Sequence, residues 1–142
     1  MKKIVLLFGL SLFTLNIQAQ VGIEKSNATD SATTELVYDI QNVDKQPKFP
    51  GGITSLQSYI NRSLKYPQIS RENNSQGRVI VRFVISSNGT VTNPQVVRSS
   101  GDFSLDMEAV RVIESMPKWK PGKHKGKPVC VFFTLPIVFK LQ

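Results

Sequence analysis

The sequence has few residues of the kinds that usually carry chemistry. Its 142 residues include one cysteine, Cys130, and one histidine, His124. A single cysteine excludes a disulfide within the chain, and its apolar neighbours predict a buried, unreactive thiol. His124 stands among lysines without a second ligand nearby, which argues against a metal site or acid–base catalysis. Because G-x-S-x-G, HExxH and the phosphate-binding P-loop are also missing, we expect no catalytic, cofactor-binding or metal-binding residues and no enzyme.

The sequence also lacks an apolar run of the roughly 20 residues that a membrane-spanning helix needs. Its first residues carry Lys2 and Lys3, then a mainly apolar stretch that ends near Ile17, and Ala19 is a small residue suited to cleavage. This pattern is typical of a secretory signal peptide over residues 1–19. We expect export to the periplasm, or anchoring in the inner membrane if the leader is not cleaved.

The segment 20–46 contains no proline and carries two lysines against five acidic residues. Its polar composition predicts a disordered tether, and the missing proline excludes a stiff polyproline spacer. Residues 47–142 carry fourteen basic and five acidic residues. The domain expected there is therefore basic and suits an acidic partner segment or an anionic lipid surface, whereas nucleic acid is not expected outside the cytoplasm.

Two helices are predicted within residues 47–142. The first has its apolar residues at steps of three and four, and Tyr66-Pro67 ends it: Ile53, Leu56, Ile60, Leu64. The second is capped by Asp102 or Ser104 and has the clearest amphipathic pattern: Leu105, Ala109, Val112, Ile113, Met116. Asp106 and Glu108 lie in its first turn, where negative charge suits the helix dipole. Residues 68–76 are polar and predicted to be a loop.

Three strands complete the predicted domain. The first starts at Gly77 and alternates apolar residues on one face, and Asn88-Gly89 predicts a hairpin turn after it. The pattern of the return strand, residues 90–98, slips by one residue, which predicts a bulge at Asn93-Pro94. Pro136 marks the last strand, Val129 to Leu141, as an edge strand. The prediction is an α+β fold with two helices packed on a three-stranded antiparallel sheet.

Six sequence segments in this order resemble a known family. They are P-K-F-P-G-G from Pro47, L-K-Y-P from Leu64, G-R-V-I-V-R-F-V-I-S-S-N-G-T-V from Gly77, S-L-D-M-E-A-V-R-V-I from Ser104, M-P-K-W-K-P-G from Met116 and L-P-I-V-F-K-L from Leu135. Together they are similar to the C-terminal domain of TonB proteins, in the form common in Bacteroidetes. The resemblance covers Pro47 to Leu141.

The resemblance implies a periplasmic domain that takes part in energy-coupled transport. Such a domain binds the TonB box, a short segment of an outer-membrane TonB-dependent transporter, as an added strand, and the ExbB–ExbD motor acts through it if it is anchored. The residues implied in this partner binding are the following: Lys65, Tyr66, Pro67, Val129, Cys130, Val131, Phe132, Phe133, Thr134, Leu135. On this basis, Val131→Pro is expected to abolish docking and spare the fold.

The sequence leaves two alternatives open. One is a stand-alone envelope module that binds peptidoglycan, anionic lipid or another envelope protein, with no role in transport. The other is a homodimer that pairs its own edge strands. Lys118 to Lys127, a basic segment around Trp119, is expected to be either an electrostatic guide for an acidic receptor segment or a lipid surface, or a solvated loop, with Trp119 in the core.

Overall fold

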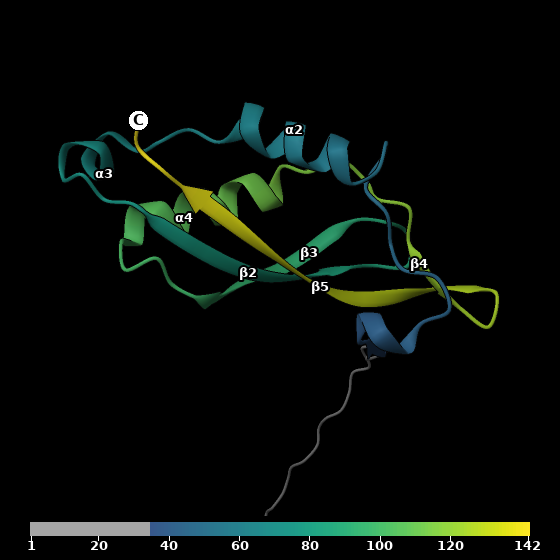
Figure 1. Cartoon of the computed structure of the whole chain (residues 1–142). Coiled ribbons are helices and arrows are strands. Elements are labelled where there is room, and N and C mark those ends of the chain that lie inside the picture. Colours follow the sequence, from purple (N-terminus) through teal and green to yellow (C-terminus); the bar gives the residue numbers. More distant parts are fainter. Residues whose placement is uncertain (1–34) are drawn as a thin grey trace, which may run out of the picture. The chain divides into compact units, whose positions relative to one another are not determined.

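A twisted β-sheet lies at the centre of the structure, a computed structural model that describes residues 35–142 (Figure 1). Strand β2 (Gly77–Ile85) pairs antiparallel with β5 (Lys127–Phe139) along its whole length and with β3 (Val91–Arg98) on its other side. A short strand, β1 (Val37–Tyr38), runs parallel to β5, so the strand order is β1-β5-β2-β3. The sheet is therefore mixed.

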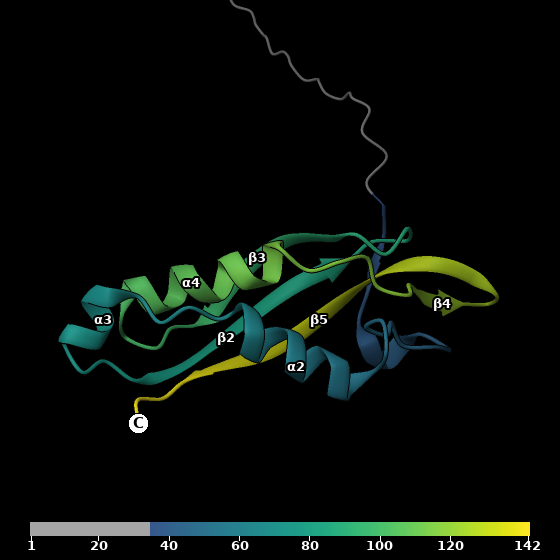
Figure 2. The ribbon, with the colours of Figure 1, turned by 90° about the horizontal axis from the view of Figure 1, so that it is seen from above.

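Two helices, α2 (Ile53–Ser63) and α4 (Phe103–Glu114), cover one face of this sheet (Figure 1). Seen from above, α4 lies over β2 and β3, whereas α2 lies on the side of β5 (Figure 2). The predicted cap of the second helix is confirmed, because the Asp102 carboxylate accepts hydrogen bonds from the N–H groups of Ser104 and Leu105. These caps satisfy N–H groups that have no partner within the helix.

The core lies between the helices and the sheet, and the predicted alternation supplies much of it. Every second residue of β2 faces the helices with no exposed surface: Val79, Val81, Phe83, Ile85. The predicted apolar face of α4 is buried as well: Leu105, Ala109, Val112, Ile113. On α2 the prediction holds for Leu56, which is buried, but not for Ile53, whose side chain is 66% exposed. Ile53 is the first residue of the helix.

The predicted bulge in the return strand is confirmed. The pairing of β2 with β3 shifts register between Arg82 and Val84, opposite Asn93 and Pro94. Asn93 has a φ of 53°, a left-handed conformation that lets the chain absorb the extra residue. A second register shift lies between Ile80 and Val81. β3 is consequently an irregular strand.

The structure adds three short elements that the sequence pattern did not predict. Helix α3 (Gln68–Glu72) occupies the predicted loop and begins directly after Pro67, whose backbone is extended. Strand β4 (Gly122–His124) forms a hairpin with the start of β5, and the turn residues Lys125 and Gly126 both have positive φ, as a type I′ turn requires. The third element is β1, and together β1 and β4 enlarge the predicted three-stranded sheet to five strands.

The predicted signal peptide and most of the predicted tether lie outside the described residues. The last part of the tether is described and has structure: β1, the 3-10 turn η4 (Ile40–Asn42), and a backbone bridge from Lys45 to Lys123. The compact unit spans Leu36–Gln142, so it begins about ten residues before the predicted boundary at residue 47. Among these residues, no helix has the length and apolar character needed to cross a membrane.

Gly89, in the predicted hairpin turn, holds the loop after α4 against the sheet. Its carbonyl accepts a hydrogen bond of 2.8 Å from the Trp119 N–H. A Cβ atom on Gly89 would lie 2.1 Å from the Trp119 carbonyl oxygen, and its φ of 90° also favours glycine. The approach buries Trp119 to 4% exposure against the rings of Phe49, Phe83 and Phe133, which confirms that Trp119 belongs to the core.

Candidate binding edge

β5 is paired along most of its length on one side only. Toward β2, its residues from Val131 to Phe139 are all in register with a partner. On the opposite side, β1 pairs with Cys130 and Val131, and no described strand continues past them. Phe132–Phe139 is therefore an open edge of the described sheet, with backbone groups that another extended chain can bond.

Pro136 indicates which backbone groups of β5 face this open edge. The β2–β5 register runs through Pro136 without a shift, as it can when the proline nitrogen faces away from β2. Because the backbone groups of a strand alternate between its two neighbours, the N–H groups of Thr134 and Val138 then face the open edge as well. Those of Phe133 and Leu135 face β2.

The structure divides the segment Val129–Leu135 that the sequence implicated in binding. Val129 pairs with Gly122 of β4, and Cys130 and Val131 are buried beside β1. Only Phe132–Leu135 extends along the open edge. Val131 is in register with Ile85 as well as with Tyr38 and has no exposed surface. The expectation that Val131→Pro would spare the fold is therefore wrong, because that position lies inside the sheet.

A hollow of about 420 Å³ lies where β1 leaves the edge. Its walls come from Asp39, from η4 and from β2 and β5: Asp39, Ile40, Gln41, Asn42, Arg82, Phe132, Phe133, Thr134. The guanidinium carbon of Arg82 lies 3.9 Å from the centre of the Phe132 ring, a cation–π contact that fixes both side chains. The hollow thus offers a positive group, an aromatic ring and open backbone groups together.

Lys65, Tyr66 and Pro67 lie at the other end of β5. The Tyr66 ring packs edge-on against Phe139, with ring centres 5.7 Å apart, and its hydroxyl donates to the Ser75 carbonyl. A second hollow, of about 460 Å³, opens beside Tyr66 and is lined also by Arg71, Asn74 and the last three residues, Lys140, Leu141 and Gln142. The structure therefore does not bring Tyr66 near Val129; the two mark opposite ends of β5.

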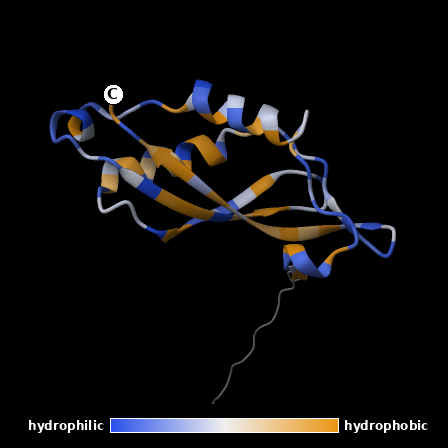
Figure 3. Cartoon of the chain, viewed as in Figure 1, coloured by the Kyte–Doolittle hydropathy of each residue, from blue (hydrophilic) through white to orange (hydrophobic). Residues whose placement is uncertain are grey.

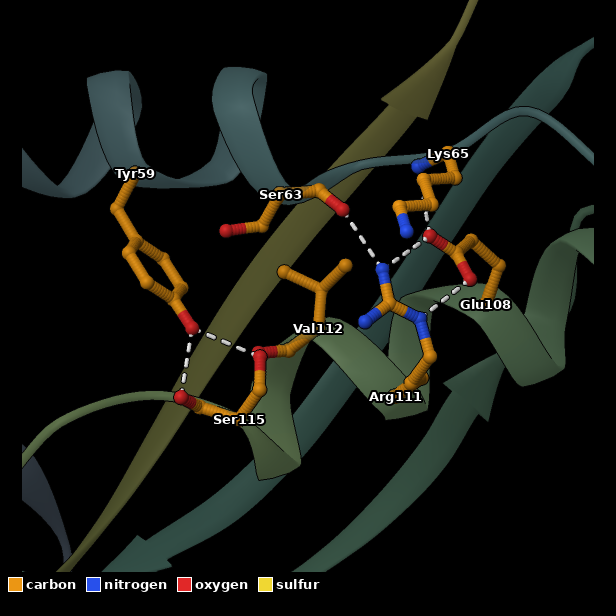
Figure 4. Close-up of polar contacts among 7 residues, drawn as sticks. All are labelled: Tyr59, Ser63, Lys65, Glu108, Arg111, Val112 and Ser115. Carbon is orange, nitrogen blue, oxygen red and sulfur yellow. Dashed lines mark hydrogen bonds and ion pairs between the residues drawn. The ribbon is translucent and has the colours of Figure 1, made fainter.

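A polar link between α2 and α4 holds the segment that carries Lys65 and Tyr66 (Figure 4). The Lys65 N–H donates to the Glu108 carboxylate at 2.7 Å, and the Arg111 guanidinium makes two hydrogen bonds of 2.7 Å to the same carboxylate. Arg111 also donates to the Ser63 carbonyl, a group at the end of α2 that lacks a partner within the helix. The turn after α2 is thereby fixed to α4.

This link shifts the pKa of both Glu108 and Arg111. Burial raises the pKa of the Glu108 carboxyl, but the hydrogen bonds from Arg111 and from the Lys65 N–H outweigh it and hold the pKa below its ordinary value. The hydrogen bond to Glu108 in turn raises the pKa of Arg111. The Tyr59 hydroxyl adds a second contact between the helices by donating to the Ser115 carbonyl at 2.6 Å.

Sequence reasoning assigned Asp106 and Glu108 only to capping and the helix dipole, and this was incomplete. Asp106 is buried and accepts hydrogen bonds from the hydroxyls of Ser99 and Ser100 and from the Ser100 N–H. Glu108 bonds a residue 43 positions away. No periodic pattern could reveal that contact. The His124 and Tyr38 ring centres lie 5.2 Å apart with the rings tilted by 45°, and His124 Nδ1 lies 3.7 Å from an Asp44 carboxylate oxygen. The described residues contain no group of ligands suited to a metal ion.

Comparison with known families identifies this architecture. The model of the family described as the Gram-negative bacterial TonB protein C-terminal matches residues 62–141, more than half of the chain. The chain belongs to this family. Its members are not enzymes and act in the periplasm, which confirms the prediction that the chain is not an enzyme.

Individual TonB proteins show the same relationship. The chain is 32% identical over 80 residues to Protein TonB of Vibrio cholerae, covering 55% of this chain and 32% of that protein. It is 24% identical over 123 residues to Protein TonB of Haemophilus influenzae, covering 84% of this chain and 46% of that protein. The chain thus spans less than half the length of these relatives.

A solved structure supports the fold. The solution structure of the TonB C-terminal domain of Helicobacter pylori matches with a TM-score of 0.50 and 25% identity, covering 80% of this chain and 98% of that one. The predicted fold class is therefore confirmed, as a TonB C-terminal fold in which helices pack on a mixed sheet.

Proposed function

We propose that the chain is a periplasmic binding module that docks the TonB box of an outer-membrane TonB-dependent transporter by strand addition to the open edge of β5. It serves energy-coupled transport as a transducer or adaptor, in the form common in Bacteroidetes. The observation that carries the proposal is the edge itself. Phe132–Phe139 offers backbone groups on the side away from β2 to an extended chain.

The two hollows at the ends of the edge support a strand as the ligand. Strand addition takes its affinity from backbone hydrogen bonds and its selectivity from pockets for alternate side chains. One hollow lies at Phe132 and Arg82, the other at Tyr66 and Arg71. Because Tyr66 packs on Phe139, both hollows border the same strand. In this proposal Lys65, Tyr66 and Pro67 contact one end of the docked segment, and Phe132–Leu135 contacts the other.

The proposal gives the remaining parts of the chain simple roles. Residues 1–19 direct export as a signal peptide or, if uncleaved, hold the domain at the inner membrane, where ExbB–ExbD could act on it. A cleaved form would act as an adaptor without a direct connection to that motor.

The test is binding of the purified chain to TonB-box peptides of outer-membrane transporters, compared with scrambled peptides. Thr134→Pro removes an N–H group that faces the open edge, so we expect affinity to fall by about tenfold or more. Thr134→Ala keeps the N–H group and should bind within about twofold of the parent chain. Val96→Pro, on the opposite edge strand β3, is the matched control and should leave binding unchanged.

Equal binding of box and scrambled peptides would remove the support for a transporter partner. Unchanged affinity of Thr134→Pro, or an equal loss in Thr134→Ala, would reject docking through the backbone of this edge. Circular dichroism of each variant verifies that the fold is intact before its affinity is interpreted.

A further inference from the structure

A second feature, separate from the β5 edge, is a hollow of about 790 Å³ beside the β4 hairpin. Four lysines line it, two from each of two extended segments: Lys45, Lys48, Lys120, Lys123. The remaining described residues that line it are Gln46, Pro47 and Pro121, so no carboxylate of residues 35–142 lines the hollow. Figure 3 shows hydrophilic residues gathered at this end of the domain, in contrast to the apolar strands.

The lysines are paired across the two segments. Lys45 and Lys123 exchange both backbone hydrogen bonds, at 3.0 and 2.9 Å, and so do Lys48 and Lys120, at 2.9 and 2.8 Å. Residues that exchange both bonds have Cα atoms only about 5.5 Å apart. Like charges placed directly opposite each other in this way destabilise the pairing. The fold thus holds two repulsive pairs side by side.

Nothing in residues 35–142 neutralises these four ammonium groups by an ion pair. The nearest acid along the chain, Asp44, accepts a hydrogen bond of 2.7 Å from the Lys125 N–H and faces His124. Lys118, Lys125 and Lys127 add further exposed positive charge on the same loop and hairpin. An anion bound in the hollow would therefore reduce the repulsion between these four ammonium groups.

The chemistry of the hollow favours one type of anion. A compact phosphate site usually offers backbone N–H groups or the fork of an arginine. Here the four lysine N–H groups are used in the backbone bridges, and no arginine lines the hollow. The two lysine pairs are three residues apart in the sequence, and all four residues line the hollow, so each segment contributes a row of two positive charges. This double row matches an extended ligand that carries several charges.

We propose that this lysine hollow binds an acidic peptide segment of a partner protein in extended conformation. Carboxylates on alternate residues of such a segment lie on one face, about 7 Å apart, within reach of both lysine pairs. Lysine side chains are flexible point charges, so they respond to the charge of a ligand more than to its exact geometry. Affinity should therefore depend mainly on how many carboxylates the peptide segment carries. The inference does not depend on docking at β5, since the lysine hollow shares no residue with either hollow at the β5 edge.

The test compares binding of the purified chain to an alternating glutamate–threonine octapeptide and to its glutamine–threonine analogue. We expect the acidic peptide to bind about tenfold more tightly or better. Lys45→Gln/Lys123→Gln should remove most of that preference. It should also keep or raise the melting temperature, because one repulsive pair is gone.

The matched control is Arg78→Gln/Arg98→Gln, which removes the same charge from exposed positions at the far end of β2 and β3. It should change the affinity by less than about twofold. An equal loss in both double variants would overturn the site, because net charge alone would then explain binding. Tighter Lys45-dependent binding of inorganic phosphate, or of phosphatidylcholine–phosphatidylglycerol vesicles, would overturn the assignment to an acidic peptide.

Discussion

The two edges of the sheet differ in regularity. β3 forms one edge, with two register shifts against β2, Pro94 and the left-handed Asn93 within eight residues. β5 forms the other edge past Val131, and its register with β2 runs through nine consecutive pairs without a shift. Bulges and prolines are devices by which proteins prevent an edge strand from accepting another chain. β3 has such protection in its centre, whereas β5 has only Pro136.

β5 is protected in a different way, by another segment of the same chain that pairs with part of its edge. At Cys130 and Val131 the chain's own residues, Val37 and Tyr38, occupy the edge. Beyond that point no strand of residues 35–142 covers the edge, which is bordered by the two hollows. Covering by β1 shortens the exposed part of β5 to about the length of a short peptide strand. The bulges of β3 make that strand a poor partner for an added strand.

The largest expected effect is on the free energy of unfolding, and it distinguishes Val131, which lies inside the sheet, from Thr134, which lies at the open edge of β5. Val131→Pro should lower the free energy of unfolding by about 2–4 kcal/mol, because it removes a buried ladder hydrogen bond between β5 and β2. Thr134→Pro should lower it by less than about 1 kcal/mol, since the N–H it removes faces solvent. Urea denaturation followed by circular dichroism measures both. Equal losses would contradict the backbone orientation inferred from Pro136.

An intermediate effect concerns the polar link between α4 and the segment that follows α2. Glu108→Gln should lower the free energy of unfolding by about 1–2 kcal/mol, because it weakens charged hydrogen bonds to Arg111 and to the Lys65 N–H. It should also weaken peptide binding more than Val96→Pro does, since Tyr66 would be held less firmly at Phe139.

The Glu108 carboxylate should also make the stability of the domain depend on pH. The folded-state pKa of Glu108 is below its ordinary value of 4.5, so its contribution is fully present above that pH and is lost as pH falls through the lowered pKa. The parent chain should therefore lose more stability than Glu108→Gln on acidification below about pH 4.5. Urea denaturation of both proteins at pH 7 and across the acid range measures this difference. Parallel curves would show that Glu108 does not contribute.

The smallest effect is a gain. Pro136→Thr should restore an N–H group on the open edge and raise the affinity for a docked strand by about fivefold, the equivalent of one hydrogen bond of about 1 kcal/mol. Self-association, followed by light scattering, should also increase, because an unprotected edge accepts a second copy. If the variant binds peptide no better than the parent chain, the Pro136 nitrogen does not face the open edge.

The sequence alone predicted the parts of the fold that have a period. The alternation of β2 and the helical spacing of α4 each extend over enough residues to be recognised, and Asn93-Pro94 revealed its bulge by breaking a pattern. β1 and β4 could not be found in this way, because two or three residues have no period and form strands only against β5.

The candidate site was predictable to a smaller extent. Pro136 correctly drew attention to β5 as an edge, but the limits of the open part depend on Val37 and Tyr38, which lie more than 90 residues before their partners. The contact of Glu108 with Lys65 and the pairing of Lys45 with Lys123 likewise join distant segments. Such contacts are set by tertiary packing, which local propensity does not encode.

Amide hydrogen exchange with and without a bound TonB-box peptide tests strand addition to β5 most directly. We expect the peptide to slow exchange of the Thr134 and Val138 amides, which face the open edge, and to leave exchange of the Val96 amide of β3 unchanged. Protection of Val96 instead, or of neither edge in a complex that demonstrably forms, would contradict docking at β5.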